Sequence, residues 1–104
     1  MMKTFNDLKF IEHDMAQAFR KPAWHAKLKF SNGFGVSVLC GEMFYSNGVD
    51  TYELAMLHND CLCYTEITDG DVLGYLSEEE VTKIMKKIQE LPKDYLTHSL
   101  PYYE

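Results

Sequence analysis

The fold is decided by the stretch Trp24-His25-Ala26-Lys27-Leu28-Lys29-Phe30, in which apolar and polar residues alternate strictly over seven positions. This period of two is that of a half-buried β-strand, whose alternate side chains face a core and solvent. A turn follows at Ser31-Asn32-Gly33, and a second alternating run extends from Phe34 to Cys40. The two runs predict a β-hairpin. Its expected core-facing residues on the first strand are Trp24, Ala26, Leu28 and Phe30.

The loop length of this hairpin sets which residues pair. A two-residue loop at Asn32-Gly33 would place the lysines of the first strand on the same face as the valines of the second, because a one-residue slip flips every side chain. A three-residue loop, with Gly33 in a left-handed conformation, pairs apolar residues with apolar residues. We therefore predict the three-residue loop. Its pairs are Phe30 with Phe34, Leu28 with Val36, Ala26 with Val38 and Trp24 with Cys40.

A second hairpin is predicted from Thr51 to Ile67, because apolar residues alternate on both sides of the polar turn His58-Asn59-Asp60. With those three residues as the loop, the expected pairs are Leu54 with Tyr64 and Met56 with Leu62. The segment between the hairpins, residues 41–50, contains Ser46-Asn47-Gly48 and is expected to be a loop.

Helical signals are strongest near the C-terminal end. Ser77 followed by Glu80 predicts a capping box, and apolar residues then recur at helical spacing from Val81 to Leu91 before Pro92. We expect residues 71–76 to form one short helical turn ahead of this helix. Residues 8–12 fit a strand or part of a helix; we favour the strand, with an irregular loop over residues 14–22.

These elements predict a single α+β domain over residues 1–104. We expect an antiparallel sheet of about four to five strands, formed by the two hairpins and packed on one C-terminal α-helix. The expected parts are an N-terminal strand or helix plus loop (1–23), two hairpins (24–67), a helical region (69–91) and an aromatic tail (92–104), part of which docks on the sheet or on a partner.

Charge is segregated along the chain. The net charge is −6, yet the first 30 residues have a balance of +3, and residues 31–80 hold ten acids with no Lys or Arg. An acidic surface disfavours direct nucleic-acid binding, which depends on basic groups neutralising phosphates. The chain contains neither an apolar run of membrane-spanning length nor the apolar core of a signal peptide, and its three cysteines are an odd number. We therefore expect a cytoplasmic protein with reduced thiols.

The cysteines offer a possible metal site. His58, Cys61 and Cys63 lie close in sequence, and Cys40 could join them from another strand. However, a Cys-x-Cys inside a strand separates its residues by about 7 Å at the backbone, unlike the tight knuckles of zinc sites. We favour two small apolar residues on the sheet face beside Leu57, which leaves the metal site as the weaker interpretation. We predict no metal, no cofactor and, in the absence of a nucleophile signature, no enzymatic activity.

Binding residues are the better candidates for function. Two groups stand out: the acids around the start of the predicted helix and the aromatic residues in loops and at the terminus. The acids are Asp69, Asp71, Glu78, Glu79 and Glu80, and the aromatic residues are Tyr45 and Tyr75, with Phe44, Tyr102 and Tyr103 as further members. One interpretation is purely structural: the acids are solvated and keep the protein soluble, and the aromatic rings pack onto the sheet. The sharper hypothesis is a negative patch that docks on a basic groove, as a nucleic-acid mimic would.

Three motifs carry a resemblance to known proteins. They are Phe30-x-Asn32-Gly33-x-Gly35-Val36-Ser37-Val38, Tyr52-Glu53-Leu54-Ala55, and Ile67-Thr68-x-x-Asp71-Val72-x-Gly74-Tyr75-Leu76-Ser77-Glu78-Glu79-x-Val81. In this order the chain resembles, over residues 5–92, a group of small uncharacterised proteins encoded by bacteriophages and prophages. The motifs mark turns, caps and core positions. The resemblance implies a small protein in the cytoplasm of a host bacterium that binds and disables a host factor.

Two functions follow as expectations. The first is a non-enzymatic inhibitor of a host defence or nucleic-acid enzyme, similar in action to anti-CRISPR proteins, which contacts a host protein with a basic surface through its acidic surface. The alternative is an oligomeric binding module that sequesters a small ligand, such as a nucleotide signal, between edge strands. Unprotected sheet edges favour a homodimer.

Overall fold

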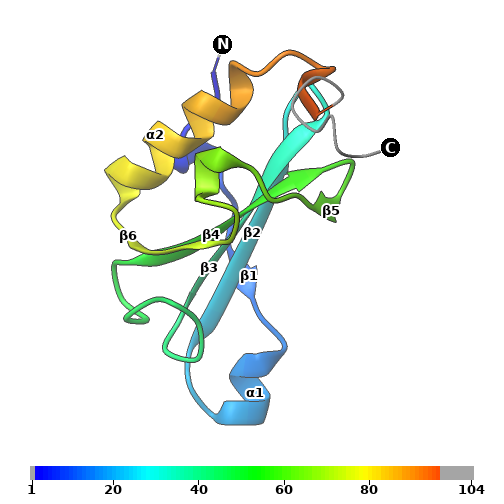
Figure 1. Cartoon of the computed structure of the whole chain (residues 1–104). Coiled ribbons are helices and arrows are strands. Elements are labelled where there is room, and N and C mark those ends of the chain that lie inside the picture. The colour runs from blue at the N-terminus through cyan, green and yellow to red at the C-terminus, as the bar shows by residue number, and fades with distance from the viewer. Residues whose placement is uncertain (1, 97–104) are drawn as a thin grey trace.

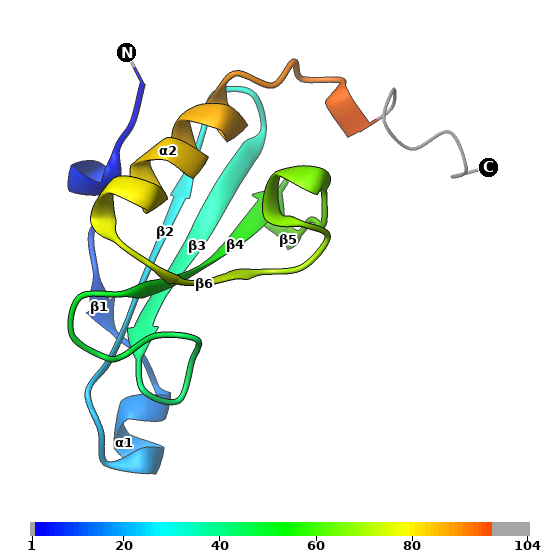
Figure 2. The same ribbon diagram turned by 60° about the vertical axis from the view of Figure 1, so that its left-hand side comes forward.

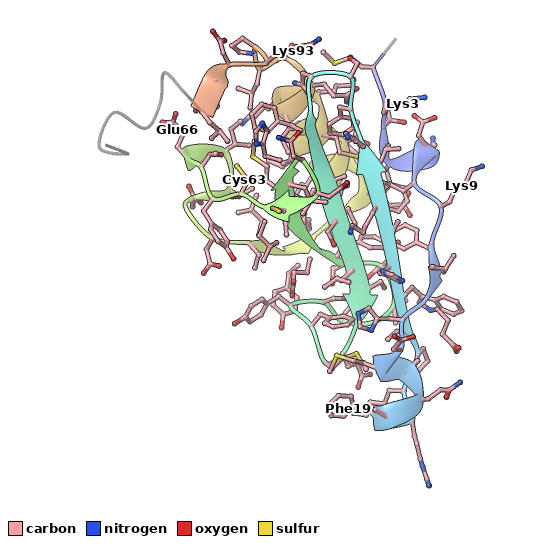
Figure 3. All side chains as sticks on the ribbon, turned by 90° about the vertical axis from the view of Figure 1, so that its right-hand side faces the viewer. Lys3, Lys9, Phe19, Cys63, Glu66 and Lys93 are labelled. Carbon is pink, nitrogen blue, oxygen red and sulfur yellow. The ribbon has the colours of Figure 1, made fainter. Side chains whose placement is uncertain are left out.

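The computed structural model describes residues 2–96 and confirms the predicted α+β class. Within these residues one antiparallel sheet has the strand order β1-β2-β3-β4-β5, and β6 also pairs with β4. The strands are β1 (Ile11–Glu12), β2 (Ala23–Lys29), β3 (Phe34–Gly41), β4 (Tyr52–His58), β5 (Cys61–Leu62) and β6 (Leu73–Leu76). The helical elements are η1 (Phe5–Asp7), α1 (Met15–Phe19), η2 (Glu66–Thr68) and α2 (Glu78–Gln89). The helix α2 lies across one face of the sheet (Figure 1), and the opposite face is turned toward the viewer in Figure 3.

The predicted register of the first hairpin is confirmed. Trp24 pairs with Cys40, Ala26 with Val38 and Leu28 with Val36. Gly33 has a φ of +89°, and the N–H of Phe30 donates to the carbonyl of Phe34 at 2.7 Å, which closes the three-residue loop.

Trp24 lies on the core side of the sheet but is not buried there, contrary to the sequence prediction. Its side chain is 42% exposed, whereas Ala26 and Phe30 on the same strand face are buried. The cause is the extent of α2, which covers the end of the sheet that carries the β2–β3 turn and leaves the end near α1 uncovered (Figure 2). The predicted register is therefore correct, but Trp24 lies past the part of the sheet that α2 covers.

The second hairpin has a different register from the predicted one. Leu57 pairs with Leu62 and His58 with Cys61, so the turn has two residues, Asn59 and Asp60. Both have positive φ values, 51° and 68°, as a type I′ turn requires, and Asn and Asp tolerate this conformation. Relative to the predicted pairing, the second strand is shifted by one residue, so each of its side chains lies on the sheet face opposite to the predicted one. Cys63 is buried in the core with Met56, and Leu62, not Cys61 or Cys63, lies beside Leu57.

Residues 73–76 form a strand, not the predicted helical turn. In β6, Leu73 pairs with Leu54 and Leu76 with Tyr52, so β6 occupies the edge of β4 that the short β5 leaves free. A helical turn does occur nearby, but it is η2, at residues 66–68. The region 69–91 is therefore part strand and part helix.

The predicted capping box of α2 is confirmed. The Ser77 hydroxyl accepts from the N–H of Glu80 at 3.2 Å, and the Glu80 carboxylate accepts from the N–H of Ser77 at 2.9 Å. Val81, Met85 and Ile88 on the apolar stripe are completely buried. They pack on the inner face of the sheet with Phe34, Val36, Val38, Leu54 and Met56.

The terminal segments agree with the sequence in part. β1 is the favoured N-terminal strand, but residues 14–22 contain the short helix α1 rather than an irregular loop. Tyr95 packs against the core and its hydroxyl donates to Glu66 at 2.7 Å. The aromatic tail residues Tyr102 and Tyr103, predicted as candidates from the sequence, lie outside the described residues. Among residues 2–96 no helix has both the length and the apolar character that a membrane span needs.

Candidate binding surface

A β-bulge in β6 is the most unusual feature of the backbone. Gly74 and Tyr75 together stand opposite the single residue Glu53 of β4, and Tyr75 has a φ of +54°. The N–H of Tyr75 donates to the carbonyl of Tyr45 at 2.9 Å. Bulges commonly re-aim a side chain, and a bulky residue rarely adopts positive φ. The bulge therefore ties β6 to the loop of residues 41–50 at the cost of local strain.

Tyr45 and Tyr75, both proposed from the sequence, are brought together at this bulge. A Cβ atom on Gly74 would lie only 2.6 Å from the Cβ of Tyr45, so the close approach requires glycine. Both tyrosines are exposed, Tyr45 by 59% and Tyr75 by 60%. Two aromatic side chains distant in sequence thus rise from adjoining backbones. In Figures 1 and 2, β6 lies between α2 and the loop that follows β3.

The loop that carries Tyr45 is held by side-chain hydrogen bonds. The buried Ser46 hydroxyl accepts from the N–H groups of Gly41 and Gly48 and donates to the carbonyl of Thr51 at 2.7 Å. The side-chain oxygen Oδ1 of Asn47 accepts from the backbone N–H groups of Val49, Asp50 and Thr51 at 2.8 to 3.1 Å. A loop braced in this way presents its exposed residues in one conformation.

A carboxylate on β4 holds the backbone of Tyr45, opposite the bulge that contains Tyr75. Glu53 is half-buried opposite the bulge, and one of its oxygens accepts from the N–H of Tyr45 at 2.9 Å. A polar residue on an alternating strand is expected simply to face solvent, so the sequence did not predict Glu53 as a site residue. We refer to Tyr45, Glu53 and Tyr75 as the bulge platform.

Two further carboxylates act on Tyr52, the neighbour of Glu53 on β4. Burial raises the pKa of the Tyr52 phenol, and the charges of Cys40, Glu78 and Asp50 raise it further. Tyr52 packs in the core, and successive strand residues point to opposite faces, so these charges act on the core side of β4 and not on the side of Glu53. Glu78 was a sequence candidate, whereas Asp50 was not.

The other predicted acids are exposed but more spread out. Asp69 and Asp71 lie before β6, at its end away from α2, and Asp71 accepts from the N–H of Val72. Glu79 lines a groove between α2 and η1, and Glu80 belongs to the capping box. The aromatic candidate Phe44 is half-buried, with its ring 5.1 Å from that of His13. The sequence cluster is thus an extended acidic strip along β6 and the start of α2.

Among residues 2–96, the acids of this strip form no ion pair. Lys21 and Glu42 do form one, at 3.1 Å, and both side chains are largely exposed. Such a pair contributes little to stability. The negative charges at the bulge and along β6 are therefore available to an external partner.

The thiols do not assemble a metal site. Cys40 and Cys63 are buried, and this burial raises the pKa of each thiol, while Cys61 is exposed. Among the described residues no group of three or more His, Cys, Asp or Glu side chains is placed to hold a metal ion.

Two cavities bear on the small-ligand alternative. One, of about 160 Å³, lies on the open sheet face among Lys27, Lys29 and Leu57, above Gly35. It is smaller than the 300 to 1,000 Å³ or so of typical ligand pockets. The other, of about 350 Å³, is lined by Glu78, Glu79 and Lys83, so two carboxylates and a single ammonium group would face a phosphate. Neither cavity suits a nucleotide.

Comparison of the chain with protein-family models, curated proteins and solved structures finds no match. The functional proposal therefore depends on the geometry of the surface itself.

Proposed function

We propose that this protein is a non-enzymatic inhibitor that binds a basic surface on a host defence or nucleic-acid enzyme. The observation that carries the proposal is the bulge platform, where two exposed tyrosines lie on hydrogen-bonded backbones, one of them strained, and a carboxylate accepts from the N–H of Tyr45. The phage origin and the bacterial host remain proposals that follow from the resemblance of the sequence motifs.

The composition of the bulge platform supports a protein-binding role. Tyrosine is enriched at the energetic centres of interfaces, because its large ring loses little conformational entropy on binding. Strain at an exposed residue does not stabilise the fold, and strained backbone is concentrated at functional sites. The strain at Tyr75 is therefore consistent with a contribution to binding.

The charge around the bulge platform favours a basic partner. Asp50 ends the loop that carries Tyr45, and Asp69, Asp71 and Glu78 belong to the acidic strip along β6 and the start of α2. Complementary charge speeds association and selects between partners, and it weakens with added salt. An acidic surface of this kind would compete with nucleic acid for a basic groove.

The proposal is tested by capturing a partner from a bacterial lysate with the protein as bait, purifying that partner and measuring two quantities. The first is the dissociation constant at 50 and 300 mM NaCl, which we expect to rise at least about tenfold. The second is the activity of the partner enzyme on its nucleic-acid substrate, which we expect to fall as the inhibitor is added. A partner that binds equally well at both salt concentrations and keeps its activity would contradict the proposal.

A further inference from the structure

We infer that the group recognised on the bulge platform is an arginine side chain of the partner. This inference rests on the proposed function and names the chemistry that the same surface would bind. It is carried by three features of the platform: a carboxylate that accepts a backbone N–H, two exposed tyrosines on the adjoining backbones, and a loop around Tyr45 that is braced by hydrogen bonds.

The fixed carboxylate belongs to Glu53. One oxygen accepts the Tyr45 N–H at 2.9 Å, so the group is held in one orientation, and no cation within the described residues neutralises it. An ionised carboxylate has about four acceptor sites, so it can still accept from a second donor. A guanidinium presents a planar fork of N–H donors that matches carboxylate geometry.

The rings of Tyr45 and Tyr75 supply the second contact. A cation over the face of an aromatic ring is attracted by the negative charge density of that face. Both side chains are about 60% exposed, which leaves ring surface free for such a contact. Two exposed tyrosines on backbones that adjoin this carboxylate therefore suit a flat cation better than a spherical one.

The choice of arginine over lysine follows from hydration and shape. The guanidinium is weakly hydrated and stacks on aromatic faces, whereas the ammonium of lysine is compact and strongly hydrated. The braced loop adds to this preference, because Ser46 and Asn47 hold Tyr45 in position before binding. Little conformational freedom is then lost when the side chain docks.

The experiment compares a nona-arginine with a nona-lysine peptide, measured by calorimetry at 50 mM NaCl and followed by amide NMR shifts. We expect nona-arginine to bind at least about fivefold more tightly and to shift the amide signals of Tyr45 and Tyr75. Glu53→Gln and Tyr75→Gly should each weaken nona-arginine binding at least about fivefold. The matched controls are Glu12→Gln, which makes the same charge change elsewhere, and Tyr64→Gly, which removes another exposed tyrosine; both should leave binding within about twofold.

The variants keep the test interpretable. The glutamine side chain introduced by Glu53→Gln retains an oxygen that can accept the Tyr45 N–H, so this variant loses the charge without losing the support of the loop. Equal affinity for the two peptides, or equal losses in Glu53→Gln and Glu12→Gln, would overturn the inference. If a natural partner still binds in a salt-dependent way after such a result, the proposed function stands and only the arginine assignment fails.

Discussion

Tyr75 combines two properties that rarely occur together, a bulky side chain and a positive φ of 54°. A left-handed conformation costs a residue other than glycine about 1–2 kcal/mol. Its ring is 60% exposed, so core packing does not compensate for this cost. A tyrosine at a position where glycine would be less strained is the reason to propose a role in binding for Tyr75.

Replacement of Tyr75 by glycine separates stability from function. Because glycine relieves the strain, we expect the Tyr75→Gly variant to exceed the matched Tyr64→Gly variant in unfolding free energy by about 1–2 kcal/mol. Tyr64 is also exposed but has no positive φ, so both variants carry the same flexibility cost of glycine. Urea denaturation measures both values. Equal destabilisation of the two variants would mean that Tyr75 is not strained.

Gly35 is required for a different reason, the close approach of β2. A Cβ atom at this position would lie 2.5 Å from the carbonyl oxygen of Leu28. Backbone in the middle of a paired hairpin cannot move aside without loss of hydrogen bonds. We expect Gly35→Ala to lower the unfolding free energy by about 3 kcal/mol, at the upper end for overpacking. Ser37→Ala on the same strand should change it by less than about 0.5 kcal/mol, and a similarly small effect of Gly35→Ala would be inconsistent with the close contact.

At the scale of elements, Asn32 joins the first hairpin to α2. Its side-chain amide donates to the carbonyls of Ile88 and Leu91, each at 2.9 Å, and its oxygen accepts from the N–H of Phe34 at 3.1 Å. The turn that was read from the sequence as a hairpin signal therefore also caps the C-terminal end of the helix.

Loss of this cap is expected to be costly. Asn32→Ala removes several hydrogen bonds to part-buried backbone groups, and we expect the unfolding free energy to fall by about 2–3 kcal/mol. Ser31→Ala, next to it in the turn, is the control and should change stability by less than about 0.5 kcal/mol. Thermal and urea unfolding of the two variants give the comparison. Similar stabilities would show that water replaces the amide at the helix end.

The elements differ in how far the sequence predicts them. The first hairpin and α2 follow from alternation, turn chemistry and capping, because their local patterns agree with their tertiary contacts. The second turn was misjudged because Asn59 and Asp60 suit a two-residue loop as well as a longer one. β6 was missed because its four residues are short and the free edge of β4 that pairs with them is a non-local feature.

Across the whole molecule, the candidate site too could be predicted only in part, because it depends on contacts between distant segments. Composition and position predict Tyr45, Tyr75 and Glu78 as candidate binding residues. The adjacency of Tyr45 and Tyr75, and the inclusion of Glu53, depend on the bulge that links β6 to a distant loop. A bulge carries no sequence signature when a tyrosine occupies the left-handed position that glycine usually takes.

Two buried thiols are expected to lower the stability of the whole molecule at alkaline pH. Burial raises the pKa of Cys40 and of Cys63 above the ordinary thiol value of about 8.5. Below that pH both thiols are protonated in the folded and unfolded states. Above it the unfolded chain releases protons first, so we expect the unfolding free energy to fall as the pH rises from about 8 to 10. Urea unfolding across this range should show a smaller fall in a Cys40→Ala/Cys63→Ala variant; an equal fall would assign the effect to other groups.

Charge-matched variants test the proposed acidic binding surface most directly. One variant carries Glu78→Gln, Glu79→Gln and Glu80→Gln, which keep the capping box because glutamine can replace glutamate there. The control carries Glu12→Gln, Asp14→Asn and Glu90→Gln, which change the net charge equally at other exposed positions. The measurement is the dissociation constant of each variant for the captured partner at 50 mM NaCl. We predict a loss of at least about tenfold for the first variant and less than about threefold for the control. Equal losses, or no loss in either variant, would contradict a localised acidic binding surface.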